Sequence, residues 1–435
     1  MARAQGFARR GAKPTHNAPI RKSRAPFLDL PPELYIQIGN YLPRRDAVNI
    51  SHCSKKLYHV FRPAVWRVLY PRGNDAEMLR GILQLKAKAK AELQAEKACV
   101  YRPSRPVVKE IRAVHIRLQA QNYSIAWEHD DSKPTQLGYE IVALIRNLPH
   151  IQQLTLDLRY LDPKQVKTLT TTLANYKLDH LASLRRVRFT SSEFDNGVTK
   201  REIDPASCGQ AISAFCAALG PKVNELEYVR GSDISNDAAF ISASSTFAST
   251  HHRRPLKRLF IARDVPWMFD PQGIKTREII ENVAVAHHKD TLEWLTIFDD
   301  SDYEPTGGEE AWNTAQDAVA FLADALSSMP CLRRAAFPII DFPVLARSGN
   351  TSITRRDDAN FEYGAVEEAM EFIGKGVLRS LPQLERVAFW SMMQARGVEA
   401  VGHGEDIHCQ FHEATEVSFM GGRESWPMGL WGYRF

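Results

Sequence analysis

The chain of 435 residues is long enough for two or three domains or for one extended array of repeats, and its 44% apolar and 25% charged residues are ordinary for a globular protein. It has no uncharged apolar run of about 18 residues and no apolar leader, so we expect neither a membrane span nor a secretory signal. The six cysteines are scattered without Cys-x-x-Cys pairs, which indicates free thiols in a reducing compartment. These features predict an intracellular protein of the cytoplasm, the nucleus or both, with no membrane partner.

Residues 1–25 are predicted to form a disordered basic tail. Residues 1–26 hold seven basic groups and no acid, whereas the remainder carries 49 basic and 51 acidic groups, so the net charge of +5 comes from this head. Its few apolar residues cannot offset the entropy lost on ordering. A solvated tail, a nuclear import signal, an anion-binding arm and a mitochondrial presequence all fit its charge. The nearly balanced charge of the body disfavours nucleic acid as a partner.

Residues 26–70 hold more large apolar side chains than three short helices can bury. The first predicted helix opens after two prolines, which suit a first helical turn, and stops at Pro43. Asp46 is the expected cap of the second helix, and we expect Leu57 and Trp66 in the core of the three helices. A core of this size is marginal by itself, so the surplus apolar surface predicts a permanent neighbour.

The order of residues in this segment resembles an F-box. The matching residues are Leu30, Pro31, Glu33, Leu34, Ile38, Leu42, Pro43, Ser51, Cys53, Ser54, Lys55, Leu57 and Trp66. The resemblance implies three helices that bind a Skp-type adaptor and, through it, a cullin-based ubiquitin ligase. By this motif match the adaptor-facing residues are Leu30, Pro31, Leu34, Ile38 and Leu42. The alternative for each of them is an ordinary position in the helix core.

Residues 71–100 are expected to form a helical linker. The segment from Ala76 to Cys99 is rich in helix formers and is amphipathic in its first half. It either joins the F-box segment to the rest of the chain or forms the first helix of the following array.

Residues 101–419 repeat a short motif that resembles one strand of a leucine-rich repeat, with apolar residues in the order L-x-x-L-x-L. It occurs as Ile111-Val114-Ile116, Ile151-Leu154-Leu156, Leu184-Val187-Phe189, Val223-Leu226-Tyr228, Leu256-Leu259-Ile261, Leu292-Leu295-Ile297, Leu332-Ala335-Phe337 and Leu384-Val387-Phe389. Between the motifs, apolar residues at helical spacing predict helices at Gly138 to Leu148, Pro163 to Leu173, Gly209 to Leu219, Ala315 to Ser328 and Val366 to Leu381. Strand and helix therefore alternate.

The predicted fold class is α/β, with an N-terminal three-helix F-box followed by an irregular leucine-rich-repeat-like α/β solenoid. A single repeat buries its apolar face only against a neighbour, which favours stacked units with parallel strands. The motifs recur at 33 to 52 residues, whereas regular leucine-rich repeats recur at roughly 20–29, so we expect an irregular array. A doubly wound α/β sheet also alternates strand and helix and is the competing architecture.

Three kinds of feature interrupt or end the array. The inserts Gly231 to Thr250, Asp299 to Glu310 and Arg347 to Asn360 are either mobile decoration or part of a binding face. A basic cluster, 251–254, and an acidic cluster, 299–310, are either solvated loops or opposite charges for target recognition. The aromatic residues of 420–435 are expected to cap the open end of the array or to bind a peptide.

No catalytic motif is present, and we predict that the protein is not an enzyme and has no cofactor. The sequence lacks the phosphate-binding Gly-rich loops and the Gly-x-Ser-x-Gly elbow. The nearest approach to a metal site is His403, His408, Cys409 and His412, whose spacing fits no standard zinc pattern, so no metal is expected.

The resulting hypothesis is a substrate-recognition subunit of an SCF-type E3 ubiquitin ligase, whose repeats bind a target protein that the sequence does not identify. The plan is similar to that of the F-box proteins of filamentous fungi. The alternative is an F-box scaffold or nuclear interaction protein without a role in ubiquitination.

Overall fold

The structure is a computed structural model that divides into two compact units, residues 1–65 and 66–435, and we treat each by itself. We call the helices of the first the trihelical unit and the second the sheet unit. The structure describes residues 30–98, 106–118, 136–158, 161–190, 205–231, 240, 242–243, 256–263, 279–299, 315–338, 363–391 and 396–413.

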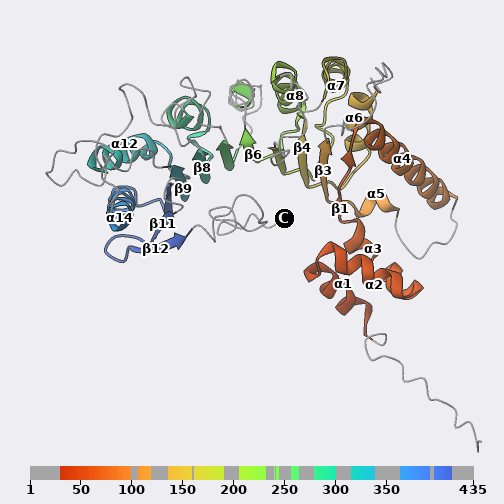
Figure 1. Cartoon of the computed structure of the whole chain (residues 1–435), viewed down its shortest axis with the longest axis horizontal. Helices are drawn as coiled ribbons and strands as arrows, with labels where there is room; N and C mark the ends of the chain where they lie inside the picture. The colour runs from red at the N-terminus through yellow and green to blue at the C-terminus, as the bar shows by residue number, and fades with distance from the viewer. Residues whose placement is uncertain are drawn as a thin grey trace, which may run out of the picture. The chain divides into compact units, whose positions relative to one another are not determined.

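The trihelical unit is made of three short helices, labelled α1 (Pro32–Tyr41), α2 (Arg44–Cys53) and α3 (Lys55–Trp66) in Figure 1. Helix α1 ends before Pro43, as the sequence predicted. The predicted cap of α2 was wrong, because the helix begins at Arg44 and Pro43 occupies the cap position without a side-chain hydrogen bond. Asp46 lies in the first turn of α2, where its negative charge interacts favourably with the positive end of the helix dipole.

Three side chains form the buried apolar cluster of the trihelical unit: Tyr35, Leu57 and Phe61. The rings of Tyr35 and Phe61 meet edge to face, with centroids 5.9 Å apart. Helices α1 and α3 approach closely at Gly39, because a Cβ at that position would lie 3.2 Å from the Cβ of Ala64. A cluster this small gives the unit little apolar burial of its own.

The sheet unit begins at Trp66, so the last five residues of the predicted F-box range, 66–70, belong to it. Trp66 was predicted in the core of the three helices, but it packs against the core of the sheet unit, and the ammonium of Lys88 lies 4.4 Å from its ring centroid. The reason is the strand that follows: β1 (Val68–Leu69) pairs in parallel with β3 (Ala113–Leu118), which binds this part of the chain to the sheet.

Helix α4 (Asp75–Lys97) belongs to the sheet unit. The side chains that recur along one of its faces are buried in the large core: Met78, Ile82, Leu85 and Ala89. This packing agrees with the second of the two roles expected for the segment, in which it is the first helix of the array. It packs against α6 (Leu137–Arg146), and β2 (Arg72–Gly73) precedes it and pairs with β3.

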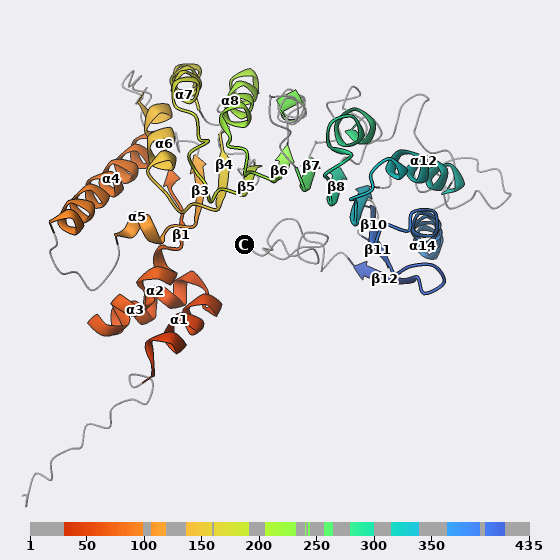
Figure 2. The same cartoon turned by 180° about the vertical axis from the view of Figure 1, so that it is seen from behind.

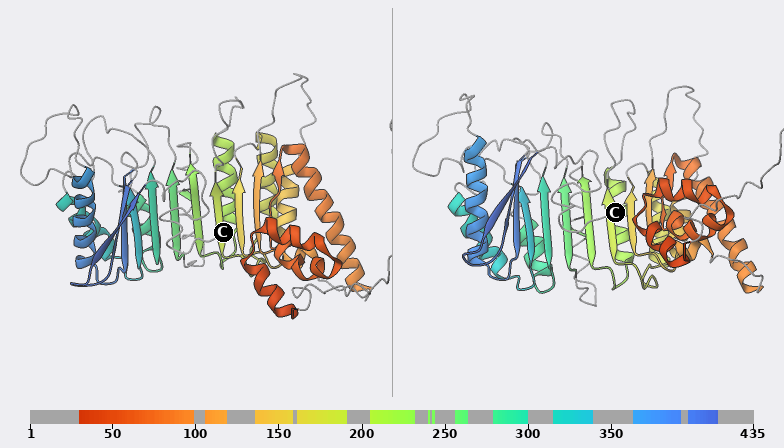
Figure 3. Two further views of the ribbon diagram at one scale, coloured as in Figure 1. Left: turned by 60° about the horizontal axis from the view of Figure 1, so that its bottom comes forward. Right: turned by 90° about the horizontal axis from the view of Figure 1, so that it is seen from below.

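The described strands form one twelve-stranded sheet in which neighbours in space follow chain order, β1-β3-β4-β5-β6-β7-β8-β9-β10-β11-β12, with β2 beside β3. Figure 3 shows the strands side by side in this order. Strands β3 to β10 are parallel: β4 (Gln153–Asp157), β5 (Arg186–Thr190), β6 (Glu225–Gly231), β7 (Arg258–Arg263), β8 (Trp294–Asp299), β9 (Arg334–Pro338) and β10 (Arg386–Ser391). A doubly wound sheet reverses its strand order at a switch point, and the described strands contain no such reversal.

The helices of the sheet unit lie on one face of the sheet, as Figures 1 and 2 show from opposite sides. Besides α4 and α6 they are α5 (Val107–Glu110), α7 (Pro163–Asn175), α8 (Pro205–Ala218), the π-helical η2 (Ile280–Val285), α11 (Ala286–His288), α12 (Ala315–Ser327) and α14 (Tyr363–Ser380). All five helices predicted between the motifs are confirmed. We call the opposite face of the sheet the inner face.

The eight predicted strand motifs are confirmed and lie in register. Their second and third apolar positions pair across the sheet, for example Val114 with Leu154 and Leu154 with Val187. All of their apolar side chains point to the helices and are buried. The backbone repeats in the same way at the strand starts, where one carbonyl accepts two amides: that of Arg112 accepts from the next strand, and that of Gln152 from the one after. This regular ladder explains the common register.

The C-terminal end of the sheet differs from the expected parallel array. Strands β11 (Arg396–Val401) and β12 (His408–Glu413) follow β10 as an antiparallel meander. The turn between them contains Gly402 at φ +123°, a backbone conformation that favours glycine.

Several predicted features lie outside the described residues: the tail 1–25, the clusters 251–254 and 300–310, most of the insert 231–250, the insert 347–360 and the segment 420–435. None of the described helices has the length and apolar character to cross a membrane.

Candidate functional site

The five residues predicted to face an adaptor divide into two groups in the trihelical unit. Pro31 and Leu34 are exposed, and Leu34 is 41% accessible. Leu30, Ile38 and Leu42 are partly buried and pack against the small core. The residues at this four-residue spacing therefore lie at the boundary between core and surface. The fully buried residue of α1 is Tyr35, which does not belong to this series.

The exposed apolar surface of this unit includes side chains that the sequence did not single out. Tyr41 is 89% accessible and Ile36 is 53% accessible on α1, and Tyr58 on α3 is 38% accessible. At 3.6 residues per turn, Leu34, Ile38 and Tyr41 share one face of α1, whereas Ile36 lies on the other side. The run of neighbouring apolar residues from Leu34 to Ile38 was the available signal, because one helix face cannot bury them all.

We define the docking face as Leu34, Ile38 and Tyr41. Exposed apolar side chains next to a core of three residues leave the unit with unburied surface that a partner helix or groove would cover. The face has no catalytic chemistry, so its capacity is binding.

The second candidate surface is the inner face of the sheet unit. Side chains alternate along a strand, so the residues between the buried motif positions point to this face. Its first inner-facing positions lie in register across six neighbouring strands and form what we call the inner row: Arg186, Glu225, Arg258, Trp294, Arg334 and Arg386. Charged residues dominate this row, in contrast to the buried rows beside it.

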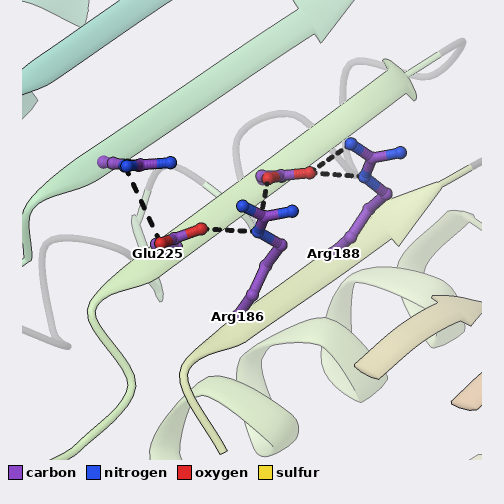
Figure 4. A network of polar contacts seen from close by, with 5 residues as sticks. Arg186, Arg188 and Glu225 are labelled. Carbon is purple, nitrogen blue, oxygen red and sulfur yellow. Dashed lines mark hydrogen bonds and ion pairs between the residues drawn. The ribbon is translucent and has the colours of Figure 1, made fainter. Parts of the chain in front are cut away.

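One end of the inner row is a paired network, shown in Figure 4. The Nε of Arg186 donates to the Oε2 of Glu225 at 2.5 Å and lies 3.3 Å from the Oε1 of Glu227. The Nε of Arg188 donates to the Oε2 of Glu227 at 2.5 Å. The Glu227 side chain has no accessible surface, so its charge depends on these two arginines. Each of the four charged side chains in this network therefore has an oppositely charged partner within it.

The middle of the inner row is a cation–π stack. The guanidinium carbon of Arg258 lies 3.6 Å from the ring centroid of Trp294, and that of Arg334 lies 4.4 Å from it. Arg258 is also 3.7 Å from the Oε1 of Glu225. The indole is therefore in contact with arginines from the strands on both sides of its own.

The far end of the row holds a second buried carboxylate. Glu399 on β11 is almost completely buried, and the Nη1 of Arg386 donates to its Oε1 at 3.3 Å. The Nε2 of His412 lies 3.8 Å from its Oε2. Burial alone would raise the pKa of the Glu399 carboxyl, but His412 and Arg386 stabilise its charged form and hold the pKa below the ordinary value.

A polar depression of about 380 Å³ lies beside the paired end of the row. It is lined by Gln152, Gln153, Ser183, Arg185, Arg186 and Glu225. Its walls are polar, unlike the apolar walls of most small-molecule sites, and Arg186 and Glu225 already bind each other. It therefore extends the inner face and does not form a separate pocket.

Within the described part of the chain, no group of three or more His, Cys, Asp or Glu side chains is placed to hold a metal ion. His408 and His412 alternate with Cys409 along β12, so the thiol points to the opposite face of the sheet. Burial raises the pKa of the Cys409 thiol. None of the five described cysteines forms a disulfide.

The sequence predicted charge for target recognition in loops, whereas the structure places the described charges on the strands. The inner row occupies the x positions of the L-x-x-L-x-L motif. The signal was present in those positions, for example Arg186 and Arg188 around Val187, but only the parallel register brings Arg258 and Arg334 to the same tryptophan.

Comparison with known families gives one match: residues 27–64 correspond to the F-box domain. This range covers the trihelical unit almost completely and includes every residue of the docking face. A comparison with curated proteins finds none that matches the chain.

Proposed function

We propose, from the F-box domain at residues 27–64, that this chain is the substrate-recognition subunit of an SCF-type E3 ubiquitin ligase. The trihelical unit binds a Skp-type adaptor, which connects it to a cullin. The inner face of the sheet unit holds the target protein. The observation that carries the proposal is the docking face, where Leu34 and Tyr41 are exposed beside a core of three side chains.

A permanent partner explains why such a small unit keeps this surface. Tyr35, Leu57 and Phe61 are its buried cluster, and domains of this size rarely bury enough apolar area to be stable alone. Covering Leu34, Ile38 and Tyr41 would extend that core across an interface. Interfaces with permanent partners resemble a domain core cut in half, and this is the relation we propose for the adaptor.

The sheet unit supports the second half of the proposal as an irregular leucine-rich-repeat-like solenoid. Its parallel strands follow chain order and its motif positions are buried in register. Each repeat contacts mainly its neighbours, so such an array presents a long continuous face for a macromolecule. The polar inner row is suited to extended protein segments more than to an apolar small molecule.

The proposed contribution to ubiquitin transfer is positioning without chemistry of its own. Holding a target beside a conjugating enzyme that carries ubiquitin raises the effective concentration of the two reactants. No catalytic residue is assigned, and the proposed role requires only that both faces bind at the same time.

The test replaces the two exposed residues of the docking face, Leu34→Ala together with Tyr41→Ala, in the full chain. Truncating central interface residues weakens binding by about 1–2 kcal/mol each, so we expect roughly thirtyfold to a thousandfold weaker affinity for a purified Skp-type adaptor, measured by calorimetry. Leu30 is avoided because it packs against the core. Exposed substitutions change stability little, and circular dichroism will check this.

The matched control is Ile36→Ala, which removes an exposed apolar side chain from the other side of α1. We expect its affinity for the adaptor to equal that of the wild type. Unchanged binding by the double variant contradicts the proposal, and an equal loss in the control contradicts the assigned face. Purification with the adaptor but without any cullin would favour an F-box scaffold over a ligase subunit.

A further inference from the structure

Arg334 differs from the other arginines of the inner row because none of the described carboxylates lies within ion-pairing distance of it, although the charges of Glu385 and Glu399 act on it from farther away. Arg186 and Arg258 share Glu225, and Arg386 binds Glu399. Within the described part of the chain, the Arg334 side chain forms no ion pair and no hydrogen bond, and its Nε is buried without an acceptor. A buried donor without an acceptor is costly, which marks a position where a ligand could supply one.

Two further arginines of the inner row lie close to Arg334. Arg386 lies beside it in register on β10, and Arg258 approaches the same indole from β7. Burial and the charges of Arg386 and Arg258 lower the pKa of the Arg334 guanidinium, and they outweigh the charges of Glu385 and Glu399, which raise it. This environment therefore disfavours the positive charge of Arg334, and an anion bound there would stabilise that charge.

Trp294 fixes the geometry of the two guanidinium groups that flank it. Its ring centroid is 3.6 Å from the guanidinium carbon of Arg258 and 4.4 Å from that of Arg334. Neighbouring strands are about 4.8 Å apart, so the row from β7 to β10 spans roughly 14 Å. Stacking reduces the rotamer freedom that these long side chains would lose on binding.

We propose that Arg258, Trp294, Arg334 and Arg386, which we call the arginine–tryptophan row, bind an anionic group on an extended segment of the target protein. Arg334 is the central residue that binds this group, and its planar fork donates hydrogen bonds to the oxygens of a carboxylate or a phosphate, which share this geometry. The inference rests on the proposed function, since it names the class of target that the inner face selects. Trp294 provides an apolar surface for the neighbouring part of the segment.

The charges of the inner face favour a peptide with a local anionic group over nucleic acid. Of the side chains described on strands β5 to β11, five arginines and three glutamates lie on this face: Arg186, Arg188, Arg258, Arg334 and Arg386, with Glu225, Glu227 and Glu399. The phosphate backbone of a nucleic acid lying along the row would be repelled by these glutamates, whereas a single anion bound at Arg334 would not have to pass them. The surplus positive charge is concentrated where Arg334 lies.

The test uses the full chain and extended peptide pools that are random except for one central position, fixed as Glu, phosphoserine or Gln. Measured by fluorescence polarisation, the affinity for the Glu pool or the phosphoserine pool should be at least about ten times higher than the affinity for the Gln pool. Which anionic pool binds more tightly distinguishes a carboxylate from a phosphate. In Arg334→Gln this preference should disappear.

The matched control is Arg333→Gln, which removes the same charge from the adjacent, exposed residue. It should keep the preference of the wild type. Arg334→Lys keeps the charge without the fork and should retain only part of it. Arg334→Gln removes the cation–π contact with Trp294 as well as the repulsion from Arg258 and Arg386, and because these effects oppose each other its melting temperature should stay close to that of the wild type.

Three outcomes would overturn the inference: no preference of the wild type for either anionic pool, an equal loss in Arg333→Gln, or tighter binding of a random single-stranded oligonucleotide than of both anionic pools. Adaptor affinity is measured on the same proteins and should be the same in Arg334→Gln and the wild type. An acidic preference without adaptor binding would reject the proposed function and leave the arginine–tryptophan row supported as a peptide site.

Discussion

Two glycine-to-alanine substitutions in helices of the sheet unit should change stability in opposite directions. Gly138 lies in α6, where a Cβ would be 2.3 Å from the backbone oxygen of Gln165 and 2.8 Å from the backbone nitrogen of Leu169. Gly81 lies in the middle of α4, with no atom within 4 Å of the position of a Cβ. Neither glycine has a positive φ, so backbone strain does not separate the two cases.

The magnitudes follow from two competing effects. Alanine in place of glycine stabilises a helix interior by about 1 kcal/mol, and less near a helix start such as that of Gly138. Overpacking costs about 1–3 kcal/mol, and the close atoms at Gly138 belong to the backbone of α7, which cannot rotate away. We expect Gly138→Ala to lower the free energy of unfolding by about 1–2 kcal/mol, and Gly81→Ala to raise it by about 0.5–1 kcal/mol.

Thermal unfolding of the full-length variants by far-ultraviolet circular dichroism measures both effects. For a unit of this size, 1 kcal/mol corresponds to a change in Tm of about 2–4 °C at most. The Gly81→Ala result reports the helix preference alone and so serves as the reference for the other variant. A Gly138→Ala protein as stable as the wild type would refute the close approach of α6 and α7.

The remaining predictions concern a buried carboxylate and a helix cap. Glu399→Gln should lower the free energy of unfolding by about 1–3 kcal/mol at neutral pH, because Arg386 loses its partner. The folded-state pKa of Glu399 is below its unfolded value, so this contribution is complete above the ordinary pKa of 4.5 and disappears as the pH falls through the folded-state pKa. Urea unfolding should therefore show the gap between wild type and variant closing below pH 4.5, and a gap that widens there would contradict the ion pair. Asp162→Ala should cost about 0.5–2 kcal/mol in the same assay, since Asp162 and Gln165 form a capping box at α7, and Asp162→Asn should be close to wild type.

The sequence predicted most of the sheet unit because its signal is local and repeated. The L-x-x-L-x-L motif places one buried residue before each strand and two on it, and every occurrence is buried on the helix side. Five helices followed from apolar spacing between the motifs. The antiparallel strands β11 and β12 have no such repeat, which is why they were not predicted.

The trihelical unit was predicted from the F-box pattern, but its surface and core were not separated correctly by spacing alone. The four-residue ridge mixes the exposed Leu34 with the partly buried Ile38, and the fully buried residue is Tyr35. Trp66 was placed in the wrong core because the strand pairing of Val68 and Leu69 is a contact with residues distant in the chain.

The sequence by itself therefore determined strands β3 to β10, the five helices between them and the buried motif positions, because these depend on periodicity along the chain. Only the tertiary structure decided which charged residues meet. Arg258, Trp294, Arg334 and Arg386 lie up to 128 residues apart in the sequence, and the parallel register alone brings them into one row. Side chains that pair across strands are chosen by register, and register is a property of the folded sheet.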